Sequence, residues 1–317
     1  MQRQSPKPLV EGALLAALAV ILALIGSYAP VIGPVVVFLW PVPIALIQMR
    51  HGLRTSLLTI VVAGTVLSTI VGAVQAVQIV AVFGLVGLAF GVCFQRKVDP
   101  MLTLAVGSAG VLLSLAVGFL ITFLIFKIKP ADMLRQLAEA TDEAVEIYRR
   151  FGMSDASINE VKKVWDTAVQ LMRYLFPAVF VMSALTEGFL IYQVSRAVLN
   201  RIGYRIEPLP PFSRWRLPAP AALVFAGAVA LTGLKDRLPW EWLYYLGFNL
   251  NFALMFLFTI HGMAVAYWFM ENRWNVSKPF RVFVLGMALF TPLLSQIALW
   301  LGVFDSLFNY RRLGLGR

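Results

Sequence analysis

The chain has 317 residues, of which 60% are hydrophobic and 14% are charged, and 27 Lys and Arg residues face 16 Asp and Glu. A soluble domain carries about a quarter charged residues, so this composition excludes a water-soluble protein and indicates an all-α polytopic membrane protein. One cysteine and two histidines leave no disulfide and little material for a metal site, so we expect no metal and no cofactor. The basic residues lie at the ends of apolar runs, which indicates membrane orientation and not nucleic-acid binding.

Apolar runs of about 20 residues predict eight or nine transmembrane helices, of which the second contains three prolines and should be kinked or broken. We place them near residues 9–29, 31–49, 55–73, 75–95, 101–127, 174–196, 217–234, 240–270 and 279–303. The chain then divides into transmembrane helices 1–5 (1–129), a helical hairpin insert (130–172), transmembrane helix 6 (173–200), a basic proline-rich loop (201–216), and the C-terminal transmembrane helices and tail (217–317).

The short loops predict a multi-pass protein of a bacterial cell (inner) membrane with its N-terminus in the cytoplasm. In this orientation fourteen Lys and Arg residues of the short loops face the cytoplasm, and the short loops on the other side contain only Lys235 and Arg237. Nine spans would, however, put the tail, with Arg311, Arg312 and Arg317, outside and against the same rule. The loop 196–216 serves either to orient and anchor the chain or to bind an acidic partner or anionic lipid.

Residues 130–172 carry too many charges for lipid and predict two amphipathic helices that turn at Gly152 outside the membrane. Ser157 and Glu160 resemble a capping box at the start of the second helix. Three roles are open: a rigid cap, a gate over an outward-facing pocket, or a stalk for a partner. The apolar stripes expected to be buried are Met133, Leu137, Ala140, Ala144, Tyr148 and Phe151, and Ile158, Val161, Trp165, Ala168 and Met172.

Glu187 is an acidic residue in the middle of the sixth predicted span. It lies nine residues, or about 14 Å along a helix, from Arg196 at the cytoplasmic boundary. A charged residue near the centre of a bilayer costs about 2.5–3.5 kcal/mol on insertion scales, so its side chain must face protein or water. Ser183 shares its helix face, and Gly188 permits close approach by a neighbour. Glu187 is either a structural hydrogen-bonding residue or a contact for a ligand, proton or ion.

Other polar residues in the spans give weaker signals. Gln75 and Gln78 are three residues apart and share a face near the outer end of the fourth helix, where they would bind a polar ligand or bond another helix. Asn249 lies in the outer third of the eighth helix and is a further ligand candidate. His261 is expected to be a packed, hydrogen-bonded histidine.

The first predicted helix carries a stripe of small residues, and such a stripe lets another helix approach closely. It serves either packing within the chain or docking of a partner helix. The candidate docking residues are Gly12, Ala13, Ala16 and Ala17.

Three segments, LVEGALLAALAVILAL, LWPVPIALIQMRHGLRTSL and LGVFDSLFNYRR, resemble the YybS-like family of bacterial predicted membrane proteins. The residues that carry the resemblance are Trp40, Pro41, Pro43, Arg50, His51, Gly52, Asp305 and Arg311. The N-terminal part of that family is similar to the substrate-binding S components of energy-coupling-factor (ECF) transporters. The resemblance implies a six-helix bundle that binds a small polar ligand near its outer face and docks an ECF T component and its ATPases through the stripe on the first helix.

The sequence contains no enzyme signature, so we do not expect catalysis. The first hypothesis is an S-component-like subunit for small-molecule binding or transport, in which Gln75, Gln78, Glu187 and Asn249 are candidate ligand contacts. The alternatives are a membrane scaffold or regulator that does not transport, and an ion-coupled secondary carrier built on Glu187 and the broken second helix. The lipid bilayer is the one partner common to all three.

Overall fold

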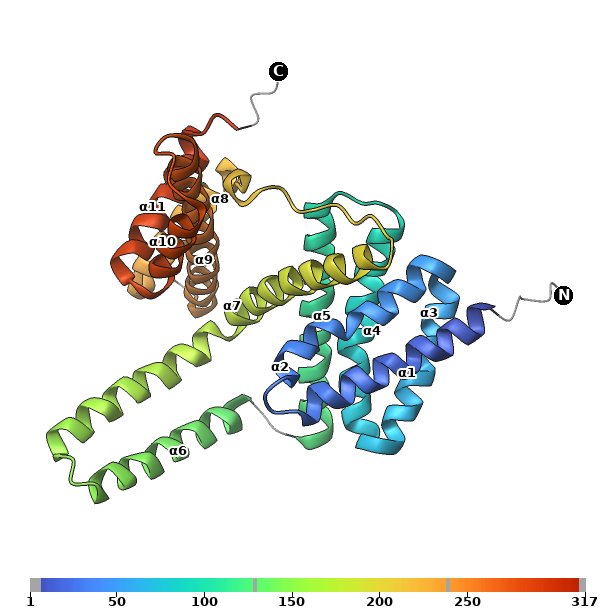
Figure 1. Cartoon of the computed structure of the whole chain (residues 1–317). Helices are drawn as coiled ribbons and strands as arrows, with labels where there is room; N and C mark the ends of the chain where they lie inside the picture. Colours follow the sequence, from blue (N-terminus) through green and yellow to red (C-terminus); the bar gives the residue numbers. More distant parts are fainter. Residues whose placement is uncertain (1–6, 128–129, 238–239, 314–317) are drawn as a thin grey trace. The chain divides into compact units, whose positions relative to one another are not determined.

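The structure is a computed structural model that describes residues 7–127, 130–237 and 240–313. Every regular element in these ranges is helical, which confirms the all-α fold class (Figure 1). The α-helices are α1 (Lys7–Tyr28), α2 (Gly33–Val36), α3 (Pro41–Val71), α4 (Ala73–Gln95), α5 (Pro100–Phe126), α6 (Pro130–Arg150), α7 (Asp155–Arg201), α8 (Ala219–Gly233), α9 (Glu241–Asn272), α10 (Lys278–Phe290) and α11 (Pro292–Phe308), and the 3-10 helices are η1 (Val37–Leu39), η2 (Phe212–Arg214) and η3 (Lys235–Arg237).

Within the described ranges, six helical segments are long and apolar enough to cross a membrane, or seven if α10 and α11 are one bent span. This is fewer than the eight or nine expected. The predicted second and third spans form one continuous segment, Gly33–Val71, which contains a sharp kink, and α8 has only 15 residues. The predicted span 279–303 is two helices bent by 105° at a proline.

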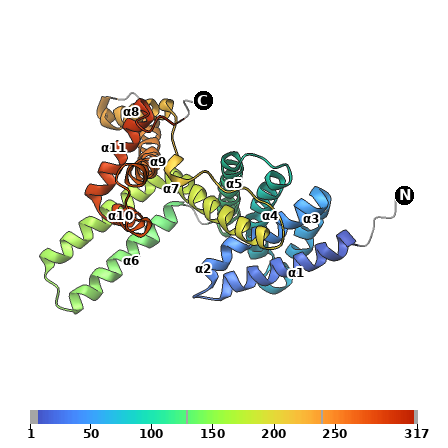
Figure 2. The ribbon, with the colours of Figure 1, turned by 45° about the horizontal axis from the view of Figure 1, so that its top comes forward.

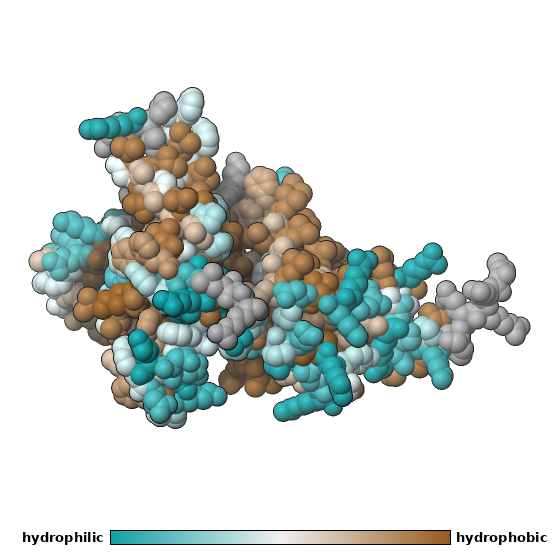
Figure 3. All heavy atoms as spheres, turned by 90° about the horizontal axis from the view of Figure 1, so that it is seen from above, coloured by the Kyte–Doolittle hydropathy of each residue, from teal (hydrophilic) through white to brown (hydrophobic). Residues whose placement is uncertain are grey.

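Hydrophobic side chains remain exposed over much of the surface. Leu14 is 67% exposed, Val61 63% and Leu124 62%, all on candidate spans. Figure 3 shows such side chains in brown across one face of the molecule. A water-soluble protein would bury them, whereas a bilayer solvates them, so the surface agrees with the membrane class.

The chain divides into two compact units, and the first comprises Met1–Met133 and Ser183–Leu209. Unit 1 thus contains the first five predicted spans and the C-terminal half of α7. Its core lies between α1, α3 and α4, where Ala16, Ile44 and Phe83 are buried. Tyr192 of α7 packs edge-on against Phe94 of α4, with ring centroids 5.7 Å apart.

Unit 2 comprises Leu134–Met182 and Pro210–Arg317. Its core is formed by α8, α9 and α11, where Phe225, Phe258 and Leu299 are buried. The backbones of α9 and α11 meet at Gly262 and Gly302, and a Cβ at either position would overlap backbone atoms of the other helix. Small residues allow this close contact between membrane helices.

The insert forms the predicted antiparallel hairpin of α6 and the first part of α7, which turns at Gly152 with φ 81° (Figures 1 and 2). The predicted capping box is wrong. Helix α7 begins at Asp155, and the Ser154 hydroxyl accepts from the backbone N–H of Ser157 at 3.3 Å.

The two apolar stripes of the hairpin are only partly buried. Ile158 is 2% exposed, but Tyr148, Phe151, Trp165 and Met172 are 41%, 86%, 42% and 52% exposed. The side chains of Met133 and Leu137 lie outside the described part of the hairpin. The hairpin therefore does not cover its own apolar surface.

Candidate functional site

Glu187 lies on the part of α7 that belongs to unit 1, within the candidate span Tyr174–Arg201. Its side chain is partly buried, and among the described residues it has no hydrogen-bond or ion-pair partner. Ser183, which was expected to share its face, is exposed. A structural hydrogen bond within the described chain therefore does not account for Glu187.

The neighbouring Gly188 is buried against Ser108 of α5. A Cβ at Gly188 would overlap the Ser108 hydroxyl and lie 3.0 Å from its Cα, so only glycine permits this contact. The Oγ atom of Ser108 is buried and has no hydrogen-bond partner among the described residues, and the same holds for Ser195 Oγ. Because Ser195 lies seven residues after Gly188, both occupy one face of α7. Unpaired polar groups thus lie along this face and at its contact with α5.

The other predicted ligand residues are placed differently. Gln75 is exposed, and Gln78 donates a hydrogen bond from Nε2 to Oγ1 of Thr122 on α5 at 3.0 Å. This bond joins α4 to α5, which is the structural alternative considered for these amides.

Asn249 bonds to α7 beside Pro177. Its Nδ2 donates to the carbonyl of Tyr174 at 2.8 Å, and its Oδ1 accepts from the backbone N–H of Ala178 at 3.0 Å. These two backbone groups are normal i and i+4 partners in a helix, and Pro177 lies between them. The Asn249 amide therefore supplies hydrogen bonds at a proline, and both ends of its side chain are occupied without a ligand.

The small residues of α1 are divided between two faces. Gly12 and Ala16 are buried, and a Cβ at Gly12 would lie 3.0 Å from Oγ1 of Thr59 on α3. Ala13 and Ala17 are exposed. Gly12 and Ala16 thus serve packing within the chain, and only the other two residues are open to a partner helix.

The W-P-x-P segment begins α3. The Trp40 Nε1 atom donates to the carbonyl of Leu22 on α1 at 2.6 Å, and the ring lies against Gly26. Pro41 and Pro43 occupy the first turn of the helix, where a missing N–H costs little. These residues thus fix α3 to α1.

Arg50 and His51 belong to an ion cluster that joins three segments of unit 1. Glu11 of α1 lies 3.1 Å from Arg50 Nη1 and 3.0 Å from His51 Nε2, and Arg50 Nε donates to the Tyr204 hydroxyl at 2.9 Å. Gly52 follows with φ 76° and kinks α3 directly after the cluster, in a conformation that glycine adopts at low cost. Sequence reasoning missed Glu11, although it is the sole carboxylate of α1.

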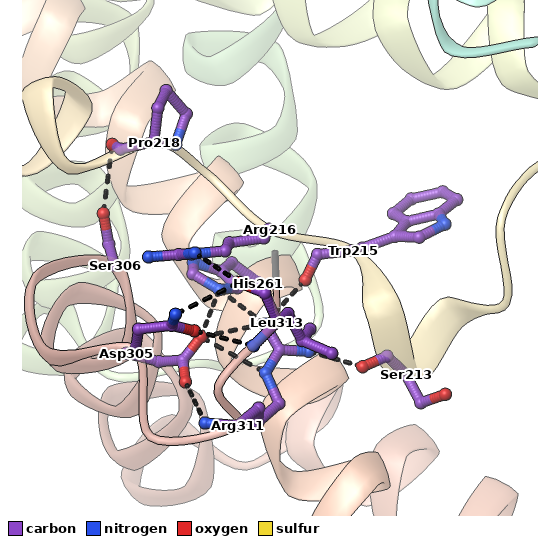
Figure 4. A network of polar contacts seen from close by, with 10 residues as sticks. Ser213, Trp215, Arg216, Pro218, His261, Asp305, Ser306, Arg311 and Leu313 are labelled. Atoms are coloured by element: carbon purple, nitrogen blue, oxygen red, sulfur yellow. Dashed lines mark hydrogen bonds and ion pairs between the residues drawn. The ribbon is translucent and has the colours of Figure 1, made fainter. Parts of the chain in front are cut away.

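Asp305 and Arg311 form a second ion cluster, which is buried in unit 2 (Figure 4). Arg311 Nη2 lies 2.9 Å from Asp305 Oδ2, and its guanidinium also donates to the backbone carbonyls of Ser213 and Trp215. The Nε2 atom of His261 lies 3.1 Å from Asp305 Oδ2 and 2.9 Å from Arg311 Nη2. The three charged or polar side chains therefore hold the end of α11 against the segment around η2.

His261 is 2% exposed, so it is a packed histidine, as expected. Its Nε2 atom either donates to the Asp305 carboxylate or accepts from the Arg311 guanidinium, and in both tautomers Nδ1 is left without a partner among the described residues. Nearly all hydrogen-bonding groups of these three side chains have partners within the protein, which is typical of a structural network.

Both ends of the bent α10–α11 pair lie beside η2. At its start, Arg281 stacks over Tyr267, whose ring contacts Phe212 at a centroid distance of 6.0 Å. At its end, Arg311 bonds to the carbonyl of Ser213. A crossing span would separate its two ends by the thickness of the bilayer, so of the two arrangements open to a pair bent by 105°, a broken span or a re-entrant loop, these contacts favour the re-entrant loop. Arg311 then lies on the same side as Arg214 of η2, as the charge rule favours.

Comparison with known proteins gives the family. The family model described as "predicted membrane protein (DUF2232)" matches residues 17–306. The chain belongs to the DUF2232 family. The "Uncharacterized protein YybS" of Bacillus subtilis (strain 168) is 26% identical over 305 residues, which cover 96% of this chain and 97% of that protein. The resemblance to the YybS-like family is therefore confirmed. No solved structure matches the chain.

Proposed function

We propose that unit 1 is a membrane-embedded subunit that binds a small polar solute at Glu187, in the cell membrane and with its N-terminus in the cytoplasm. The observation that carries the proposal is the unpaired Glu187 carboxylate beside the α5–α7 contact, where the buried hydroxyl of Ser108 is also unpaired. A buried polar group without a partner costs about 1–3 kcal/mol, so a ligand that bonds to the Ser108 hydroxyl would recover this cost, and the partly buried Glu187 offers it a second contact.

The chemistry of these groups limits the solute. A carboxylate accepts hydrogen bonds or pairs with a cation, and a serine hydroxyl both donates and accepts. The proposed solute therefore carries an ammonium or another strong donor and at least one further polar group. The unpaired hydroxyl of Ser195 lies on the same face of α7 as Gly188, two turns further along the helix, and would extend this polar face.

An S-component-like role for this subunit is supported by the composition of unit 1, which joins the first five predicted spans to the C-terminal half of α7. In that role an ECF T component and its ATPases would dock on α1. The exposed Ala13 and Ala17 are the residues open to such a partner, because Gly12 and Ala16 pack within the chain. Ala13→Trp should then block copurification of these partners without unfolding the protein.

Native mass spectrometry of the detergent-purified chain tests the solute site. We expect a small molecule retained by the wild type, lost from Glu187→Gln and reduced in Ser108→Ala. Ser183→Ala is the control, because Ser183 is on the same helix but exposed. A ligand retained equally by Glu187→Gln and the wild type, or no retained ligand after purification from lysates of several growth media, would refute the proposal.

A membrane scaffold is the second candidate, and the exposed apolar side chains of the hairpin favour it. Phe151 and Val164 are 86% and 69% exposed in a segment that is not part of a candidate span. Glu187→Gln should leave the binding of a scaffold to its partner unchanged. The same change should abolish solute binding by a binding subunit and transport by an ion-coupled carrier.

A further inference from the structure

Contacts between four segments bring many basic residues to one end of unit 1. Glu11, near the start of α1, bonds to Arg50 of α3, and Arg50 donates to the hydroxyl of Tyr204, which follows α7. The Nε2 atom of Gln48 donates to Oε1 of Gln95, the last residue of α4, at 3.1 Å. The start of α1, the kink of α3, the end of α4 and the end of α7 therefore lie together.

This end of unit 1 is strongly basic. The segments 7–11, 48–54, 95–99 and 196–207 contain eight Lys and Arg residues and three acidic residues. Within the described part of the chain, Arg50 is the one of these eight that forms an ion pair. Six of the others are exposed, and we call them the basic collar: Lys7, Arg54, Arg96, Lys97, Arg201 and Arg205. Such an excess of unpaired positive charge attracts an anionic partner.

The basic collar lies where candidate spans begin and end, which is the depth at which lipid headgroups meet the hydrocarbon. One span begins at Lys7, and two others end at Gln95 and Arg201. Apolar side chains beside the collar are exposed too, with Leu53 53% and Ile202 48% exposed. Headgroup phosphates pair with the cations and the acyl chains below them cover the apolar side chains, whereas a nucleic acid or an acidic soluble protein complements the charges alone.

We propose that the basic collar binds the headgroups of anionic phospholipids. Arginine binds phosphate oxygens through two parallel N–H donors, and four of the six collar residues are arginines. Because the collar is built from the ends of four helices, bound lipid holds these helices together. Anionic lipid therefore stabilises unit 1 as well as binding to it.

The hairpin offers a matched control within the same chain. Residues 130–173 contain eight acidic and six basic residues, so this segment has no excess of positive charge. Three of its exposed arginines form ion pairs with neighbouring carboxylates, namely Arg135, Arg149 and Arg150. Removal of these arginines changes the net charge of the protein by the same amount as removal of three collar arginines, without touching the collar.

Native mass spectrometry of the full-length protein, released from nanodiscs with equal amounts of phosphatidylglycerol and phosphatidylcholine, tests the proposal. We expect the wild type to retain phosphatidylglycerol in preference. Arg54→Gln with Arg96→Gln and Arg205→Gln should lower this preference more than tenfold, because each basic residue near an anionic lipid surface contributes about 1 kcal/mol, or about five-fold. The control variant, with Arg135, Arg149 and Arg150 changed to Gln, should keep it. Equal retention of the two lipids by the wild type, or an equal loss in the two variants, overturns the proposal.

Thermal unfolding of the wild type gives a test that does not depend on the folding of a variant. Phosphatidylglycerol should raise the melting temperature above that in phosphatidylcholine, and high ionic strength should reduce the difference. Inorganic phosphate should not replace the lipid. If inorganic phosphate raises the melting temperature as much as phosphatidylglycerol does, or if RNA or an acidic protein copurifies with the wild type and not with the collar variant, the collar is not a lipid-binding surface.

Discussion

Two carboxylates, Asp305 of unit 2 and Glu187 of unit 1, differ in whether the described chain pairs them. In unit 2, the Asp305 carboxylate pairs with Arg311, whose guanidinium also bonds to two backbone carbonyls. In unit 1, the partly buried Glu187 carboxylate has no partner in the described chain, and Ser108 Oγ is unpaired as well. The network of Asp305 and Arg311 leaves only His261 Nδ1 unpaired among the described residues and stabilises one arrangement of the chain, whereas an unpaired carboxyl group leaves capacity for a ligand.

This difference predicts different responses to substitution. Residues of the unit 2 network should affect stability strongly and binding little. Glu187 should affect binding and leave stability nearly unchanged. The following substitutions test the two halves of this statement.

The largest effect is expected for Asp305→Leu. It leaves the 4% exposed Arg311 without its counter-ion, and breaking a buried pair by removing one partner costs about 3–5 kcal/mol. Thermal unfolding of the detergent-purified protein should show a large loss of stability. Asp305→Leu combined with Arg311→Met removes both charges and should lose less than Asp305→Leu alone. If the double variant is the less stable of the two, the charge pair is not the source of the effect.

Gly262→Ala should be the next most destabilising change. The added Cβ would overlap the carbonyl oxygen of Ala298 and force α9 and α11 apart, at a cost of about 1–3 kcal/mol. Gly286→Ala in α10 is the control, because a Cβ there meets no atom within 4 Å. Equal melting temperatures for the two variants would show that α9 and α11 do not pack as described.

The sequence predicts the parts of this fold that depend on composition and helical period. The apolar runs locate the helices, and the charged insert is a hairpin that turns at Gly152, because these signals are local. The number of spans was overestimated. Residues 31–49 and 55–73 run together through a kink at Gly52, and 279–303 is bent at Pro292, which are details of backbone geometry that hydropathy does not encode.

The same distinction between local signals and long-range contacts applies to the site residues. Asp305 and Arg311 were found through the family resemblance, but their contact with His261 joins positions 44 and 50 residues apart in sequence, and no periodicity reveals it. Asn249 was expected to bind a ligand and instead bonds to Tyr174 and Ala178 beside Pro177. An interior proline in a long helix is the signal that would have predicted a polar residue at this place.

Asn249→Ala should destabilise unit 2 by about 1–3 kcal/mol, because the carbonyl of Tyr174 and the N–H of Ala178 lose the amide at a proline. The measurement is hydrogen exchange at Ala178, which should become faster together with a lower melting temperature. Asn251→Ala is the matched control, since Asn251 is partly buried on the same helix and has no partner among the described residues. Similar exchange in the two variants would assign no role to the Asn249 bonds.

Glu187→Gln is expected to have the smallest effect on stability, within about 0.5 kcal/mol, since no hydrogen bond or ion pair in the described chain is lost. The change keeps the size of the side chain and replaces the carboxyl group by an amide, so unfolding of the ligand-free protein should be nearly the same as in the wild type. The wild type should instead be stabilised by added solute, by an amount that grows with the solute concentration, and the variant should not. If Glu187→Gln lowers the stability of the ligand-free protein as much as Asn249→Ala does, the carboxylate has a structural partner, and the contrast between the two units is lost.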